Sequence, residues 1–243
     1  MKKIPRIGIV GLGKFGIMHL RAFTQFENDG LCVLAGRADL NENLLAERSR
    51  EYRAKPYRDM KEMIRKEKLD GVAVATPDHL HKAVAMEAMK AGAHVLVEKP
   101  MDTTIAGCEE MTRLSEKKGL LLEVDFHKRY DPYHRNLEKA SVEGRFGKIL
   151  YGYAYVEDRV EVPRDWFKGW AKNSSSAWFI GIHLYDLIRW IVKSEVKRVY
   201  ATARKEKLAS LGVDTYVFVQ AKLDFESGAS FCASSSRKRP SSF

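Results

Sequence analysis

The sequence predicts an α/β protein with two parts: a doubly wound parallel sheet of the Rossmann type, then an α+β domain with a large, mostly antiparallel sheet. Three observations support this fold. A glycine-rich turn joins the first apolar strand to a helix, strands and helices then alternate through residue 124, and the chain beyond residue 196 is rich in strands. We therefore expect domains over residues 1–126 and 127–243.

The glycine-rich turn follows an apolar strand at residues 6–10 and precedes an amphipathic helix that carries Leu20 and Phe23. Its three glycines have the spacing G-x-G-x-x-G, which is typical of dinucleotide-binding turns. Gly11 permits the sharp turn, Gly13 lets a pyrophosphate approach the backbone, and Gly16 lets helix and strand pack closely. The sequence therefore predicts that a dinucleotide binds here, along the segment Gly11, Leu12, Gly13, Lys14, Phe15 and Gly16.

The elements that follow alternate as expected for a parallel sheet covered by helices on both faces. We expect strands at 31–35, 71–75, 94–97 and 120–124, and helices at 41–52, 79–91 and 105–118, the last capped by Thr103 or Thr104. A further short helix, capped by Asp59, carries Met60, Met63 and Ile64. Ligands of such sheets bind beyond the carboxyl ends of the strands. The segments predicted to meet at that edge are 11–16, Asp39, 76–81 and 98–100.

Asp39 is the acidic residue expected to bind the ribose of the dinucleotide. It lies more than the usual interval of about 20 residues after the glycines. A carboxylate there accepts the adenine ribose hydroxyls and repels a 2′-phosphate, so we expect NAD, with NADP as the alternative. Arg37, two residues earlier, would soften that repulsion.

The second half of the chain has a different pattern. We expect helices at 133–143 and 182–192, a polar loop at 158–176, and strands at 149–156, 197–204, 215–224 and 229–234. Tyr151, Tyr153 and Tyr155 alternate along the first of these strands and so share one face, where they suit sheet packing or a subunit interface.

Composition limits the classes of protein that fit. The chain has 243 residues, 45% of them hydrophobic, with no apolar run of membrane-spanning length and no secretory signal at the N-terminus. Its three cysteines lie far apart and suit a reducing cytoplasm, without a disulfide framework or a metal site. The net charge of +10 is spread over predicted helix surfaces, so we expect no nucleic-acid partner and no membrane partner.

Several motifs together resemble one family over essentially the whole chain. They are the glycine segment 11–16, Thr76-Pro77-Asp78-His79-Leu80-His81, residues 91–100 ending in Glu98-Lys99-Pro100, Arg129 with Pro132, and Ile182-His183-Leu184-Tyr185-Asp186. In this order they resemble the glucose–fructose oxidoreductase / inositol dehydrogenase / rhizopine-catabolism (Gfo/Idh/MocA) family. The resemblance implies an NAD(P)-dependent dehydrogenase that acts on the CH–OH group of a sugar, cyclitol or related polyol.

The resemblance also assigns the catalytic residues. Lys99 is the implied proton-transfer residue, and a lysine can accept that proton only if burial and the positive nicotinamide lower its pKa towards neutrality. His183 is the implied second catalytic residue; the alternative for it is a core histidine. The substrate contacts implied are Lys99, His183 and Asp186.

One departure from the family leaves a second function open. The family often has an aspartate four residues before the catalytic histidine, and here that position is Phe179. Because a benzyl side chain cannot relay a proton, the alternative is a dinucleotide-binding regulatory or sensory protein of the same fold without turnover.

The remaining assignments are to the coenzyme or to packing. Besides the glycine segment and Asp39, the resemblance implies coenzyme contacts from Thr76, Pro77, His79, His81, Glu98, Lys99, Pro100 and Arg129. The alternatives are capping for the two histidines of this set, a structural ion pair for Arg129 and a surface carboxylate for Asp186. His19 and His94 are expected to be packing residues.

Family members usually continue well past the equivalent of Phe243, whereas this chain ends at Arg237-Lys238-Arg239-Pro240-Ser241-Ser242-Phe243. We therefore expect a second sheet that is short at its C-terminal end and presents an edge or face that a second copy of the chain covers. The resemblance implies a homo-oligomer that pairs through this sheet.

Overall fold

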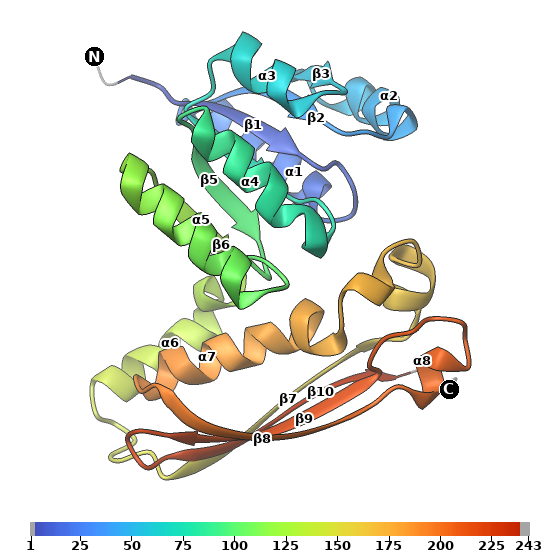
Figure 1. Cartoon of the computed structure of the whole chain (residues 1–243). Helices are drawn as coiled ribbons and strands as arrows, with labels where there is room; N and C mark the ends of the chain where they lie inside the picture. Colours follow the sequence, from blue (N-terminus) through green and yellow to red (C-terminus); the bar gives the residue numbers. More distant parts are fainter. Residues whose placement is uncertain (1–2, 239–243) are drawn as a thin grey trace. The chain divides into compact units, whose positions relative to one another are not determined.

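The computed structural model describes residues 3–238, which divide into two compact units with the boundary between Asp125 and Phe126 (Figure 1). Each unit has its own sheet and its own hydrophobic core. Residues 239–243, the last part of the terminal segment 237–243 named above, lie outside the described residues.

The first unit is built on six parallel strands in the order β3-β2-β1-β4-β5-β6. Their bounds are β1 Arg6–Val10, β2 Val33–Ala38, β3 Lys55–Tyr57, β4 Gly71–Val74, β5 His94–Glu98 and β6 Leu122–Asp125. The strand order reverses between β1 and β4, and the crevice beyond the carboxyl ends of such a pair is where ligands bind. The predicted doubly wound parallel sheet is confirmed.

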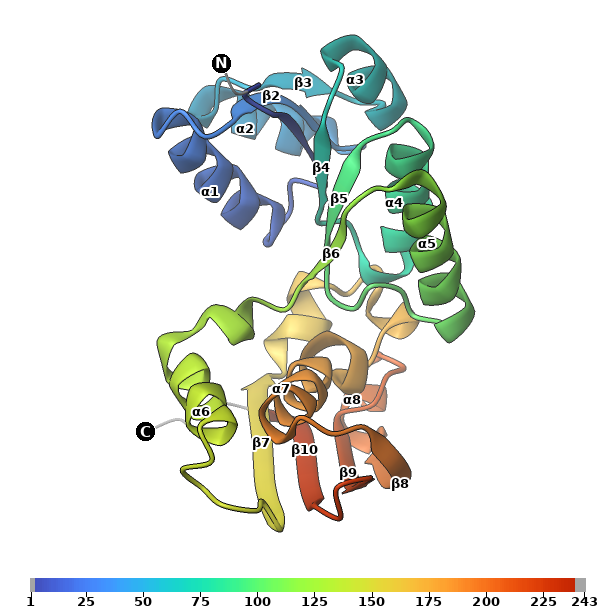
Figure 2. The same ribbon diagram turned by 90° about the vertical axis from the view of Figure 1, so that its left-hand side faces the viewer.

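Helices cover both faces of this sheet (Figures 1 and 2). One face packs against α1 (Gly16–Asn28) and α2 (Glu42–Glu51), and the other against α3 (Met60–Glu67), α4 (His81–Lys90) and α5 (Ile105–Lys118). Each face has a core of its own, centred on Leu20 and Ile9 on the first and on Met63, Met89 and Met111 on the second. Local chemistry fixes the helix starts, because Asn41, Asp59 and Thr104 each accept a backbone N–H as N-cap.

Several element bounds in the first unit differ from the prediction, and three differences matter most. Strand β2 runs from Val33 to Ala38 rather than over 31–35, so it ends directly before Asp39. Strand β3 was not predicted, since its three residues carry too little periodicity to be seen and form only by pairing at the edge with β2. The helix expected from residue 79 is preceded by a separate short turn, Asp78–Leu80, and α4 begins at His81.

The edge strand is tied to α3 by a buried carboxylate. Glu67 accepts from the Tyr57 hydroxyl (2.5 Å), from Lys55 (3.1 Å) and from Arg6 (2.7 Å). The hydrogen bond from Tyr57 lowers the pKa of Glu67, and the same bond raises the pKa of Tyr57 to about 12. Because the pKa of Glu67 is lowered on folding, its charge stabilises the fold above the pKa of the unfolded carboxyl, and this stabilisation is lost as the pH falls. Because the pKa of Tyr57 is raised on folding, its neutral phenol stabilises the fold below pH ~10, and this stabilisation is lost as the pH rises.

We therefore expect Glu67→Gln to lower the free energy of unfolding at neutral pH by about 1–2 kcal/mol, the low end for hydrogen bonds to a charged group because Lys55 and Arg6 are partly exposed. The loss should shrink below pH ~4, where wild-type Glu67 begins to be protonated in the unfolded chain. Urea unfolding of both proteins from pH 3 to 9 measures this. A deficit that stays constant with pH would contradict the assigned role of the Glu67 charge.

The second unit contains a four-stranded mixed sheet in the order β7-β10-β9-β8. Its strands are β7 Tyr151–Arg159, β8 Val196–Arg204, β9 Phe218–Phe225 and β10 Ser230–Lys238. Of the three pairs that these four strands form, β10–β7 is parallel and the other two are antiparallel. The predicted, mostly antiparallel sheet is confirmed. One face packs against α7 (Ile182–Val192), with Ile188 against Leu223 and Phe225, and α6 (Pro132–Val142) packs on α7.

The polar loop predicted at 158–176 has more structure than expected. Strand β7 continues to Arg159, and short helical turns follow at Val162–Trp166, Ala171–Asn173 and Ala177–Gly181. These turns, with the short helix α8 (Glu206–Ala209), enclose a small core of Val160, Ala171, Leu208 and Val213. Apolar residues spaced widely in a polar segment gave no periodic signal, so tertiary packing produces these turns.

Within the described chain, no helix combines the length and apolarity that crossing a bilayer requires.

Candidate active site

The glycine turn has the geometry that binding of a pyrophosphate needs. Gly11 has φ +90°, and a Cβ there would lie 2.5 Å from the Ala75 carbonyl oxygen. A Cβ on Gly16 would lie 1.9 Å from the Gly11 carbonyl oxygen, so only glycine lets α1 start against the turn. At Gly13, by contrast, none of the described residues other than Gly13 and its two chain neighbours has an atom within 4 Å of the Cβ position. The open space at Gly13 is therefore available to a ligand approaching the backbone.

A cavity of about 670 Å³ opens at this edge of the sheet. Gly11, Gly13, Asp39, Thr76, Pro77 and Leu80 are among the residues that line it. One Asp39 carboxylate oxygen accepts from the backbone N–H of Leu12 (2.7 Å) and the other from that of Asn41 (2.8 Å). Each carboxylate oxygen has a second lone pair for a ribose hydroxyl. The residues present thus fit a dinucleotide with its ribose at Asp39.

Arg37 does not face this cavity, which corrects the expectation that it would soften the repulsion of a 2′-phosphate. Its side chain is 1% exposed, and its guanidinium donates to the carbonyl oxygens of Tyr52 and Ala54 and to the Ser49 hydroxyl (2.6 Å). Burial lowers the pKa of this guanidinium. Arg37 therefore adds no positive charge beside Asp39; Arg58 also lines the cavity and donates to Glu42.

Lys99 lies in the same unit, directly after β5, and is 4% exposed. Its ammonium group stands 5.4 Å from the centre of the Phe15 ring, within cation–π distance. Phe15 belongs to the glycine turn, so the implied catalytic lysine contacts the segment predicted to bind the coenzyme. Glu98, also buried, lies at the end of β5 beside it.

His81 connects two of the loops at this edge. Its Nδ1 lies 2.7 Å from the Pro100 carbonyl oxygen and its Nε2 lies 2.8 Å from that of Thr76. Each ring nitrogen therefore lies at hydrogen-bond distance from a carbonyl oxygen of a different loop, which suits a role in holding these loops together. His79 is half-buried in the turn before α4, and Thr76 and Pro77 line the cavity.

His183 lies in the second unit, in the first turn of α7, and is buried. Its ring packs edge to face against His127 (4.8 Å between centroids) and lies 6.4 Å from Phe126. Nearby, Arg129 forms a two-point ion pair with Asp186, with Nε 2.8 Å from Oδ2 and a second contact from Nη2 to Oδ1. This pair supports the structural alternative for Arg129. Asp186 is buried and so is not the surface carboxylate considered for it.

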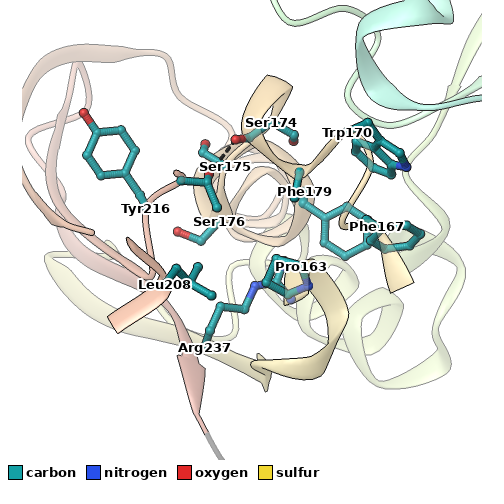
Figure 3. Close-up of a pocket in the computed structure, with 12 residues that line it drawn as sticks. Pro163, Phe167, Trp170, Ser174, Ser175, Ser176, Phe179, Leu208, Tyr216 and Arg237 are labelled. Carbon is teal, nitrogen blue, oxygen red and sulfur yellow. Dashed lines mark hydrogen bonds between the residues drawn. The ribbon is translucent and has the colours of Figure 1, made fainter. Parts of the chain in front are cut away.

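Phe179 lies among aromatic rings and an arginine (Figure 3). Its ring centroid is 5.1 Å from that of Phe167 and 6.5 Å from that of Trp170, and the Arg237 guanidinium stands 5.0 Å from it. Arg237 in turn pairs with Asp158. A cavity of about 20 Å³, enough for one water molecule, lies beside this cluster. The position where the family often has an aspartate is therefore built into an aromatic packing arrangement.

Sequence reasoning missed some of these polar arrangements. His19, expected to pack, instead points its Nε2 at the carboxylates of Glu98 (3.1 Å) and Asp125 (3.8 Å). His94, also expected to pack, is exposed, and its Nδ1 accepts from the Leu121 N–H (2.9 Å). Arg237 alternates with Ala233 and Ser235 on the inner face of β10, which is the one signal that could have placed it.

Comparison with known families decides the identity of the chain. Residues 5–126 match the model of an oxidoreductase family with an NAD-binding Rossmann fold, and residues 134–242 match the GFO/IDH/MocA C-terminal domain. The chain belongs to the Gfo/Idh/MocA family. The oxidoreductase class and the NAD-binding domain implied by the sequence motifs are thereby confirmed.

Among characterised members of the Gfo/Idh/MocA family, this chain is similar to inositol dehydrogenases. It is 29% identical over 240 residues to myo-inositol 2-dehydrogenase of Thermotoga maritima, covering 96% of this chain and 69% of that protein. It is 28% identical over 239 residues to inositol 2-dehydrogenase 1 of Saccharopolyspora erythraea, covering 91% and 69%. The chain thus spans about two thirds of the length of these relatives.

Solved structures of Gfo/Idh/MocA proteins show the same fold. The crystal structure of myo-inositol 2-dehydrogenase from Lactobacillus plantarum matches with a TM-score of 0.87 at 26% identity, over 98% of this chain and 71% of that one. The scyllo-inositol dehydrogenase of Lactobacillus casei with bound NAD(H) and scyllo-inositol matches with a TM-score of 0.84 at 23% identity, over 97% and 70%, which shows the shared fold alone.

Proposed function

We propose that this protein is an NAD-dependent dehydrogenase that oxidises one hydroxyl of a cyclitol such as inositol, or of a related polyol, to the carbonyl. The observation that best supports this is the contact between Lys99 and Phe15, because it joins the implied proton acceptor to the coenzyme-binding turn within one unit. The names of the relatives supply the class of substrate.

The proposed chemistry separates a proton from a hydride. NAD, when bound, accepts the hydride that leaves the substrate carbon. The neutral amine of Lys99 accepts the hydroxyl proton, His183 contacts the substrate and assists that transfer, and the carbonyl forms as the C–H bond breaks. The remaining coenzyme roles are structural: the glycine turn accommodates the pyrophosphate, Asp39 accepts from the ribose, and His81 holds the loops at 76–77 and 99–100.

A second function is a coenzyme sensor without turnover. Phe179 is the observation that favours it, because a benzyl side chain cannot relay a proton and this one packs against Phe167 and Arg237. Under this alternative the glycine turn still binds the coenzyme, and the second unit reports binding instead of handling a substrate.

Turnover separates the two functions. We expect the purified protein to reduce NAD with myo-inositol or scyllo-inositol, and to use NADP at least about tenfold less efficiently because Asp39 repels a 2′-phosphate. Absorbance of the reduced nicotinamide, measured across a panel of cyclitols and sugars with each coenzyme, tests this. Tight NADH binding with no turnover on any polyol would instead establish the sensor.

The proposal includes a cytoplasmic homo-oligomer without nucleic-acid partners. The face of the second sheet opposite α7 carries Tyr151, Tyr153, Tyr155 and Tyr200, each 71–78% exposed. Large exposed aromatic patches of this kind suit a protein interface. A second copy of the chain is the proposed occupant of this face.

A further inference from the structure

A buried hydrogen bond near Lys99 has no part in the chemistry described so far. His19 lies on α1 and is 7% exposed, and its Nε2 is 3.1 Å from Oε1 of Glu98 and 3.8 Å from Oδ2 of Asp125. An ionised carboxylate only accepts hydrogen bonds, so a bond to it requires the tautomer with the hydrogen on Nε2, which then donates to Glu98. Three elements, α1, β5 and β6, thus meet at one imidazole.

The position of His19 on α1 connects the coenzyme turn to the end of β5. His19 comes four residues after Phe15, so both side chains project from the same side at the start of the helix. Phe15 contacts the Lys99 ammonium, and His19 binds Glu98, the residue directly before Lys99. The start of α1 is itself fixed against the glycine turn, because Gly16 packs on the Gly11 carbonyl.

We propose that His19 is a positioning residue of the dehydrogenase, which holds Lys99 in place through Glu98 and thereby links its position to the helix that receives the coenzyme. The proposal rests on the function proposed above. Without the imidazole, the buried Glu98 carboxylate loses a donor and the turn that carries Lys99 can shift. A displacement of about 1 Å in a reacting group lowers rates by roughly 100-fold.

A divalent cation is the rival explanation of this cluster. One ligand atom from each of His19, Glu98 and Asp125 lies within 4.8 Å of the others. The separation of 3.1 Å between His19 and Glu98 is, however, an ordinary hydrogen-bond length. Ligand atoms held about 2.0–2.2 Å from a tetrahedral zinc ion would stand somewhat farther apart. The geometry therefore favours a direct bond.

The test compares His19→Gln with His19→Ala, because the glutamine amide nitrogen can replace Nε2 as donor to Glu98. We expect His19→Ala to lower kcat by about 10- to 100-fold, with KM for NAD and for the polyol changed less than about threefold. His19→Gln should restore kcat to within about threefold of wild type. Leu20→Ala, a core substitution on the same helix, controls for lost stability: at a temperature where all variants are folded it should keep wild-type kcat.

A second measurement needs no turnover. In protein labelled with ¹³C-lysine, the Lys99 Cε resonance, identified by its absence from Lys99→Met, should move in His19→Ala and stay near its wild-type position in His19→Gln. Wild-type activity after treatment with EDTA should be unchanged.

Four results would overturn the proposal. Two concern kcat: an equal decrease in His19→Ala and His19→Gln, or an unchanged kcat in His19→Ala. The other two are a Lys99 Cε resonance that moves in neither variant, and activity that is lost on EDTA treatment and restored by Zn²⁺ or Mn²⁺. Wild-type protein inactive on every polyol would defeat the proposed function alone, and the resonance would still decide the role of His19.

Discussion

Replacing Lys99 with alanine is expected to lower kcat by about 10²- to 10⁴-fold, the usual contribution of a positioned general base, while NADH still binds. The effect is large because Lys99 is the implied acceptor of the hydroxyl proton and is buried against Phe15. Stopped-flow measurement of single turnovers, together with a titration of NADH, separates the chemical step from binding.

Lys99→Arg is the matched control for this prediction. Arginine keeps the positive charge and can lie over the Phe15 ring, but its guanidinium does not give up its proton at working pH. We expect Lys99→Arg to be nearly as inactive as Lys99→Ala. Activity within threefold of wild type in the arginine variant would show that charge, and not proton transfer, is what position 99 supplies.

Alanine substitutions at two glycines of the same turn should have different effects: a loss of stability at Gly16 and a loss of coenzyme affinity at Gly13. A methyl group at Gly16 would overlap the Gly11 carbonyl, so we expect Gly16→Ala to lower the free energy of unfolding by about 1–3 kcal/mol or more. No described residue beyond its chain neighbours crowds the Cβ position of Gly13, so Gly13→Ala should unfold like wild type and lose only coenzyme affinity. Thermal unfolding without coenzyme measures the first half of this contrast. Equal melting temperatures for the two variants would contradict the assigned roles.

Much of the first unit could be predicted because its signals are local. Each of these signals can be recognised within a few consecutive residues: the glycine spacing, the continuous apolar run at β4, and the capping residues Asp59 and Thr104. Helices α5 and α7 begin and end at the predicted residues. Short β3 was missed because edge pairing with β2, and not its own sequence, makes it a strand.

Side-chain direction in the candidate site could not be predicted in the same way. Arg37 and Asp39 are two residues apart, yet one turns into the core under α2 and the other faces the cavity. The difference follows from where β2 ends, which the sequence placed three residues early. His19 shows the same limit, since its partners Glu98 and Asp125 lie 79 and 106 positions away along the chain.

Binding of the coenzyme at the glycine turn is the claim on which the rest depends, and calorimetric titration of NADH into wild type and Gly13→Ala tests it most directly. We predict a dissociation constant in roughly the micromolar range for wild type and at least about tenfold weaker binding for the variant, which is folded like wild type. Equal affinity in the two proteins, or no heat of binding in wild type, would contradict the account.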